Sequence, residues 1–502
     1  MDDIDMELIW NEFGVQRLVM RRTAQVELEG TVPLPENIGA VSELIDYSAS
    51  VTADACRTDE GRVLVSGRIE LQAAALTPDE KPFAFTSESE FSSETEAEEV
   101  CPGMNADALP LLKSLTLRAV GGSQLRLNAV IDIELTVTTA APTRTLAGIS
   151  GLTDLETKKE ELRTARRVEL ANETVRIGEE ISGGAEEVLK YSVQLSMRDT
   201  GMENGSASVS GILQLNALCR SAEGELMQLV RSIPFRESIA LSGSADEIYT
   251  AAEIRNVEVR SLGTEFSLVA VDADVNFRVF GMRRGSISLP VDAFSPTLDF
   301  DCITERIEVL NAEGGACGQY SVRDNISVPE GYPDIFTALH ASANPIVTSV
   351  NFDDGTMRAE GLLITRLVYR SSDNTLHAFT EEVAFGFNMA APVGTGFARL
   401  RVYAQPSITG GGGRTAQISF AIDACAEFLS ETGINAVTGI VENGRPKKDS
   451  AFSGGIVIYN ACEGEMFFDI AKRFRVAAGS VKALNPDARE PACSGDRLIV
   501  IA

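Results

Sequence analysis

The residue types that most often carry catalysis or metal binding are sparse in this chain. It has two histidines, His340 and His377, and neither has a second histidine or a cysteine at metal-ligand spacing. Both are expected to be ordinary surface or half-buried side chains. The eight cysteines occur singly and form no C-x-x-C pair: Cys56, Cys101, Cys219, Cys302, Cys317, Cys425, Cys462 and Cys493. We expect reduced and mostly buried thiols, with a Cys462–Cys493 disulfide as the less favoured alternative.

Three further stretches resemble functional motifs only in part. Gly410–Thr415 lacks the Gly-Lys-Ser/Thr ending of a phosphate loop and lies between two strand-like runs, which predicts a hairpin loop. The glutamate-rich stretch Glu88–Glu99 lacks EF-hand spacing and predicts a solvated loop or edge strand. Ser206 follows a glycine, but no second glycine completes a nucleophile elbow. The sequence therefore predicts a protein that is not an enzyme and uses no metal or cofactor.

Composition narrows the class of partner. The 502 residues carry 73 acidic and 44 basic side chains, a formal net charge of -29. Such a surface repels polyanions, so we expect neither nucleic-acid binding nor attraction to anionic lipid. No apolar run approaches the length of a spanning helix, which predicts no membrane insertion. The acidic start, Met1–Glu7, does not resemble a signal peptide, so a cytoplasmic location is expected.

One unit is repeated three times along the body of the chain. The glycine-bounded stretches Gly61–Gly67, Gly205–Gly211 and Gly355–Gly361 share their length and are each followed by an alternating strand pattern. Each unit also ends in two strand-like runs around a glycine turn, as in Leu115–Val120 and Leu125–Leu135. Period-two alternation around such turns is typical of half-buried antiparallel hairpins.

A short amphipathic stretch precedes each glycine pair. These stretches are Ile38–Ile45, Ile181–Leu189 and Ile335–Leu339, and we interpret them as one helix in each unit. The fold class predicted for the whole chain is therefore mainly β with some α (α+β), built from tandem antiparallel β-rich units.

The last fifty residues differ from the body in charge and pattern. They read as a strand (Ile456–Tyr459), two short helices (Glu465–Phe474 and around Val481–Leu484) and a second strand (Arg497–Ile501). Their acidic and basic side chains balance, so the acidic excess lies in the body. The intervening Gly, Pro and Ser residues are typical of a flexible linker.

The tail resembles a LysM domain, a small βααβ module that binds glycans or proteins. Three repeats followed by this tail resemble SPOCS-domain proteins, the SipL-like spore-morphogenesis proteins of clostridia. The resemblance covers nearly the whole chain. It divides the chain into SPOCS-like units at 1–150, 151–292 and 293–440, a linker at 441–453 and a LysM domain at 454–502.

The resemblance also implies a site. In this family the turn that opens the first helix and the turn after the second form the binding surface. To these loop positions we add the exposed face of the first helix, with Phe468 as an exposed anchor beside a basic ridge. The candidate binding residues are Gly464, Glu465, Met466, Phe467, Phe468, Lys472, Arg473, Arg475, Asn485, Pro486 and Asp487.

The tail departs from the family pattern where ligands bind. Gly464-Glu465-Met466-Phe467 stands where Gly-Asp-Thr-Leu is common, and Met and aromatic residues favour a protein interface over a sugar site. The resemblance implies a scaffold in spore-coat or envelope assembly in the mother-cell cytoplasm at the spore surface. Its partner would be a spore-coat morphogenetic ATPase or another coat protein. The alternative is a cell-wall protein that binds peptidoglycan through N-acetylglucosamine glycan.

Overall fold

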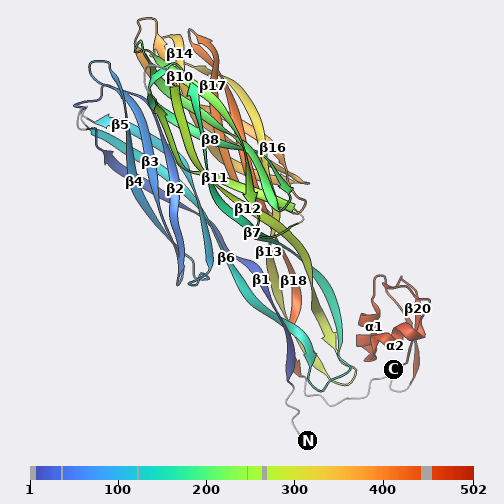
Figure 1. Ribbon diagram of the computed structural model, residues 1–502. Coiled ribbons are helices and arrows are strands. Elements are labelled where there is room, and N and C mark those ends of the chain that lie inside the picture. Colours follow the sequence, from blue (N-terminus) through green and yellow to red (C-terminus); the bar gives the residue numbers. More distant parts are fainter. Residues whose placement is uncertain are drawn as a thin grey trace.

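The chain folds almost entirely into antiparallel β-sheets (Figure 1). The structure is a computed structural model that describes residues 7–35, 38–120, 124–245, 247–262, 268–442 and 455–501. Helices in these ranges are confined to α1 (Phe467–Phe474) and α2 (Ala478–Leu484), of 8 and 7 residues. The predicted α+β fold class is therefore wrong, because strands dominate and the three repeated units contain no helix in the described residues.

The first six strands form two three-stranded sheets. In sequence order, β1 and β6 pair along their whole lengths and β5 adds to β6, while β2, β3 and β4 form a meander. Alternate residues of β3 and β6 are buried, so the two sheets share an apolar core. The strand bounds are β1 (Leu8–Val32), β2 (Glu43–Asp59), β3 (Arg62–Leu76), β4 (Pro82–Glu96), β5 (Asn105–Val120) and β6 (Gln124–Ile149).

The same arrangement recurs twice. The sheet orders β11-β12-β7 with β10-β9-β8, and β13-β18-β17 with β14-β15-β16, repeat the order of the first six strands. The second group is β7 (Glu156–Ser182), β8 (Ala185–Glu203), β9 (Ser206–Ser221), β10 (Leu226–Ala240), β11 (Glu247–Ser261) and β12 (Leu268–Phe294). The third is β13 (Phe300–Ser327), β14 (Ile335–Asp353), β15 (Thr356–Ser371), β16 (Leu376–Ala390), β17 (Phe397–Gly412) and β18 (Thr415–Glu442).

The first glycine of each repeated pair makes a tight turn. Gly61, Gly205 and Gly355 have φ of 70°, 82° and 79°, a left-handed region that side chains disfavour. Each is the second residue of a two-residue hairpin loop. In two units the preceding Asn204 and Asp354 also have positive φ, as a type I′ turn requires.

The second glycine of each pair makes room for an aromatic ring. A Cβ on Gly361 would lie 2.2 Å from the carbonyl oxygen of Ile346 and 2.7 Å from the ring of Phe385. Gly67 meets Phe91 and Gly211 meets Phe235 in the same way. The repeat therefore encodes a ring packed over a bare backbone, one in each unit.

The predicted helices of the repeated units are strands or connections. Ile335–Leu339 lies in β14, and Ile181–Leu189 spans the end of β7, a glycine turn and the start of β8. The first stretch, Ile38–Ile45, leads into β2 and includes its first three residues. Neighbouring strands supply hydrogen-bond partners and buried faces along these segments, and this tertiary pairing overrides a short amphipathic pattern.

The three units pack against one another in a closed ring. β3 and β4 lie against β8, β10 lies against β14, and β15 and β16 lie against β2. In each unit the two sheets pack face to face. Beyond these packed sheets, the long strand pairs β1–β6, β7–β12 and β13–β18 continue side by side toward one end of the molecule (Figure 1). Their contacts bury an apolar cluster drawn from all three units: Val15, Leu162, Leu289, Ile307, Val309 and Ala436.

A cross-strand disulfide lies within the third unit. Cys317 of β13 and Cys425 of β18 are directly paired residues and their sulfurs are bonded. The expectation that all cysteines are reduced is wrong for this pair, because register pairing brings the two thiols together. The other six cysteines, including Cys462 and Cys493, are free.

The C-terminal residues form a small separate module. β19 (Ile456–Asn460) pairs with β20 (Arg497–Ile501), and α1 and α2 lie between them in sequence. Phe467, Ile470 and Ala471 turn one face of α1 into the module's core. The predicted linker 441–453 falls largely on residues 443–454, outside the described ranges, while its first two residues belong to β18.

Candidate functional site

Several predicted binding residues hold the module together. The Glu465 carboxylate accepts hydrogen bonds from the Tyr459 hydroxyl at 2.9 Å and from the Cys462 backbone N–H at 2.9 Å. Asn485 is buried and bridges elements: its Nδ2 donates to the Val481 and Ile499 carbonyls, and its Oδ1 accepts from the Ile499 N–H. These side chains have their polar groups committed to the fold.

The two predicted loops have different surroundings. Gly464, with φ 81°, donates from its backbone N–H to the Ala492 carbonyl at 2.9 Å, so the turn that opens α1 lies against residues near 490–494. Met466 is half-buried at the N-terminus of α1. Pro486 and Asp487 are exposed in the turn after α2. No hydrogen bond described for Gly464 or Met466 reaches Pro486 or Asp487.

Phe468 is not exposed, contrary to the sequence prediction. Phe467 and Phe468 are only 3% and 8% exposed. Phe467 lies in the module's core, whereas the ring of Phe468 packs edge-on against Phe294, with centroids 5.1 Å apart. Phe294 ends β12 in the second unit, so the body of the chain covers the expected anchor.

The basic residues of α1 divide between two surroundings. Lys472 Nζ lies 2.6 Å from both carboxylate oxygens of Asp292, and Arg475 Nη2 lies 2.8 Å from Asp299 Oδ1. Arg473 instead lies over the ring of Tyr459 and pairs with Glu465 at 3.1 Å. The predicted ridge therefore contributes two cations to the body and one to the module itself.

The surface that receives the module is one end of the second unit. We call this surface the tip: residues 292–300, which join β12 to β13, together with Glu156 and Lys158 at the start of β7. Lys158 Nζ lies 3.1 Å from Asp469 Oδ1, and the backbone N–H of Ala478 donates to Glu156 at 3.3 Å. The module thus lies beside the end of the long strands in Figure 1.

The contact is polar around one apolar centre. The side chains of its three ion pairs are 23–44% exposed, so each pair contributes about 0.2–1 kcal/mol. The Phe294–Phe468 ring pair adds roughly 0.5–1.5 kcal/mol beyond its buried area. Salt weakens partly exposed pairs, so the contact is expected to loosen as ionic strength rises.

Sequence reasoning missed the tip. Asp292, Phe294 and Asp299 form no known motif and lie at the junction between two repeated units. The available signal was the charge boundary between an acidic body and a neutral tail with basic residues on α1. That boundary indicated complementary surfaces but did not show which acidic residues face the module.

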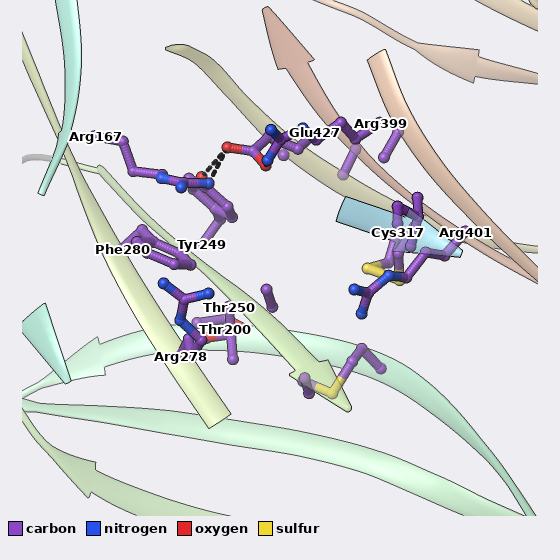
Figure 2. Close-up of a pocket in the computed structure, with 18 of the residues that line it drawn as sticks. Arg167, Thr200, Tyr249, Thr250, Arg278, Phe280, Cys317, Arg399, Arg401 and Glu427 are labelled. Atoms are coloured by element: carbon purple, nitrogen blue, oxygen red, sulfur yellow. Dashed lines mark hydrogen bonds and ion pairs between the residues drawn. A yellow bond between two sulfur atoms is a disulfide. The ribbon is translucent and has the colours of Figure 1, made fainter. Parts of the chain in front are cut away.

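A cavity of about 340 Å³ lies where the three units meet (Figure 2). Glu427 forms an ion pair with Arg167 and accepts a hydrogen bond from the Tyr249 hydroxyl at 2.9 Å. Burial raises the pKa of Tyr249, and Glu427 raises it further, so the phenol remains a donor. Burial alone would lower the pKa of Arg167, but Glu427 and Tyr249 together outweigh it and raise that pKa.

Three further arginines of the cavity lining also face carboxylates. Arg399 pairs with Asp107, Arg278 with Glu169 and Arg401 with Glu253. Cys317, which lines the cavity, is held in its disulfide. Arg399–Asp107 and Arg401–Glu253 join different units, whereas Arg278–Glu169 lies within the second unit. Each of these three arginines therefore has a neighbouring counter-charge.

A second polar cluster is buried where β2, β8 and β14 approach one another. Asp46, Lys190 and His340 are at most 3% exposed, and Asp46 Oδ2 lies 2.7 Å from Lys190 Nζ and 3.2 Å from His340 Nε2. Burial alone would raise the pKa of Asp46, but Lys190 and His340 outweigh it and hold the pKa below its usual range. Burial lowers the pKa of His340, which keeps its imidazole neutral. Side chains so inaccessible to solvent belong to the contact between the units and not to a binding surface.

The described ranges contain neither a metal-binding cluster nor a membrane-spanning helix. No group of three or more His, Cys, Asp or Glu side chains gathers closely enough there to hold a metal ion. Neither described helix has the length and hydropathy needed to cross a bilayer.

Comparison with known proteins adds no relative. The chain matches no protein-family model, no curated protein and no solved structure at the significance required.

Proposed function

We propose that this chain is a non-enzymatic scaffold that docks to another protein through its C-terminal module. The proposed role is in spore-coat or envelope assembly in the mother-cell cytoplasm, and the proposed partner is a coat morphogenetic ATPase or another coat protein. The observation that carries the proposal is the contact between α1 and the tip. Phe468, Lys472 and Arg475 there form a mixed aromatic and cationic surface that fits protein side chains.

The interlocked body suits a scaffold. Its three units share buried polar and apolar clusters, so they present their outer surfaces in one fixed arrangement. The module is joined to β18 by a short segment of the chain, residues 443–454. A binding module so tethered is kept at high local concentration near any surface to which the body attaches.

Glycan binding through the same module is the second candidate. The exposed loop residues Pro486 and Asp487, with Gly464 on the other predicted loop, favour it because the tip does not cover them. Under this alternative the chain is a cell-wall protein that binds peptidoglycan. The half-buried Met466 and the committed side chains of Glu465 and Asn485 leave few polar groups on these loops to orient a sugar.

A paired sedimentation assay with the full chain separates the two functions. The chain is mixed with purified peptidoglycan, and separately with purified, polymerised coat ATPase from a sporulating bacterium. Sedimentation with the polymer, reduced by Lys472→Glu, supports protein docking. The matched control is Lys159→Glu, because Lys159 is exposed on β7 outside the contact. Sedimentation with peptidoglycan, but not with the coat polymer, would instead support glycan binding.

A further inference from the structure

The first helix of the module has two neighbouring faces that are both covered. One face packs into the module's core through Phe467, Ile470 and Ala471. Phe468 and Lys472, at i and i+4, share a second face of the helix, and Arg475, the C-cap residue with φ 54°, extends that surface. We call this second face the docking face. Its Lys472 and Arg475 form ion pairs with the tip, and its Phe468 packs against Phe294 of the tip.

The tip displays a specific chemical pattern to the docking face. Phe294 stands between two carboxylates, Asp292 and Asp299, and its ring meets Phe468 while the carboxylates meet Lys472 and Arg475. This arrangement shows which partner chemistry the face accepts. A complementary segment carries an aromatic ring flanked on both sides by acidic groups.

The contact is suited to exchange between partners. All three of its ion pairs are partly exposed, which makes each one weak and sensitive to salt. Its strength within the chain comes in part from the short connection to β18, which raises the effective concentration of the tip. An external segment of the same chemistry must overcome that local advantage.

We propose that the docking face binds an acidic, aromatic protein segment, and that the tip occupies this face until such a segment displaces it. The proposal rests on the proposed function, in which the module docks to a protein. It adds the chemistry of the partner and an autoinhibited state of the free chain. The bound partner and the tip are mutually exclusive on α1.

The autoinhibited contact can be tested by cross-linking the full chain. In Phe294→Cys/Phe468→Cys, the two new thiols replace rings whose centroids lie 5.1 Å apart. Mild oxidation should give a faster-migrating intramolecular product that Asp292→Lys/Asp299→Lys suppresses. The two single-cysteine variants control for the native thiols. A double-cysteine chain that cross-links no more than its single-cysteine controls would overturn the contact.

The partner chemistry can be tested with a peptide cut from the tip. The probe is a labelled, cyclised peptide of residues 291–300, Val-Asp-Ala-Phe-Ser-Pro-Thr-Leu-Asp-Phe. It should bind full-length Asp292→Lys/Asp299→Lys at least tenfold more tightly than the wild-type chain, because the variant frees the docking face. Replacing the peptide's Phe294 by Ala, or adding Lys472→Glu to the chain, should abolish binding. Equal affinity for both chains, or no binding to the released chain, would overturn the proposal.

These measurements are separable from the test of the proposed function. Cross-linking reports the contact within one chain and requires no external partner. If the chain cross-links and binds the peptide but does not sediment with coat polymer, the docking face stands and the coat partner fails. If it sediments equally well with and without the tip substitutions, docking stands and the autoinhibition fails.

Discussion

The carboxylate of Asp46 and the ammonium of Lys190 lie 2.7 Å apart, and they occupy the same place in two different repeated units. The offsets that separate Gly61, Gly205 and Gly355 also lead from Asp46 to Lys190 and on to His340. Three equivalent positions thus carry an acid, a base and a neutral imidazole. Ser342 adds a 2.8 Å hydrogen bond to the other oxygen of Asp46.

Removing the base should be more damaging than removing the pair. Lys190→Met leaves Asp46 buried without its main counter-charge and should lower the free energy of unfolding by about 3–5 kcal/mol, whereas Asp46→Leu/Lys190→Met should recover much of that loss. Urea unfolding followed by circular dichroism measures both. Lys159→Met, at an exposed position, is the matched control and should change stability by about 0.5 kcal/mol or less. A loss equal to the control would show that the ion pair is dispensable.

Stability should fall with pH below the usual pKa of histidine. Burial lowers the pKa of His340 from 6.5, so the unfolded chain takes up a proton at a higher pH than the folded chain does. The free energy of unfolding should therefore decrease as pH falls below 6.5, by up to about 1.4 kcal/mol per pH unit, until the lower folded pKa is passed.

His340→Gln tests this pH dependence. Asp46, Lys190 and the nearby Arg366 are the charged groups around the imidazole, and all three remain in the variant. The free energy of unfolding, measured between pH 7.5 and 5.5, should depend less on pH in the variant than in the wild-type chain. The difference in slope should correspond to the uptake of about one proton on unfolding. Parallel pH profiles would exclude His340 as the source.

The glycine under the Phe385 ring should tolerate no side chain. Gly361→Ala places a Cβ 2.2 Å from the Ile346 carbonyl oxygen and 2.7 Å from the ring, so backbone and ring must both move. Overpacking of this kind costs about 1–3 kcal/mol, measurable by thermal and urea unfolding. Gly30→Ala is the control because its Cβ would meet nothing within 4 Å. An equal effect for both substitutions would contradict the close approach.

The disulfide should be visible as missing thiols. Thiol titration of the unreduced, denatured chain should find six reactive cysteines, and eight after reduction. Replacing Cys317 and Cys425 by serine should lower stability by about 2–4 kcal/mol in the absence of reductant, because the bond closes a long loop of the unfolded chain. Eight reactive thiols before reduction would contradict the bond.

Local strand pairing was predictable from this sequence where glycine marked it. The runs Leu115–Val120 and Leu125–Leu135 lie in β5 and β6 and pair as their alternation predicts. Gly410–Thr415 is the hairpin end of β17 and β18, again as predicted. In both cases the signal is local, since a turn and its two flanking strands lie within a few dozen residues.

What failed depended on distant residues. Ile335–Leu339 has a helical pattern, but β15 supplies its hydrogen bonds and places it in a sheet. Phe468 was predicted to be exposed because it lies opposite the apolar face of α1, and Phe294, far away in sequence, covers it. The buried place of His340 likewise depends on Asp46 and Lys190 in other units. No local pattern encodes such partners.

The hydrogen bonds between the three units use different residues at equivalent positions, which is possible because the units are joined in one chain. Asn216 donates to the Ala341 carbonyl, Arg366 donates to the Ile45 carbonyl, and Gln72 accepts from the Tyr191 N–H, so equivalent positions use three different side chains. A homotrimer made from one short gene would have to repeat a single residue at each such position. Three copies of Asp46 could not share its buried place, because like charges would repel. Because the copies are joined in one chain, the three equivalent positions can carry different residues that complement one another, as Asp46, Lys190 and His340 do.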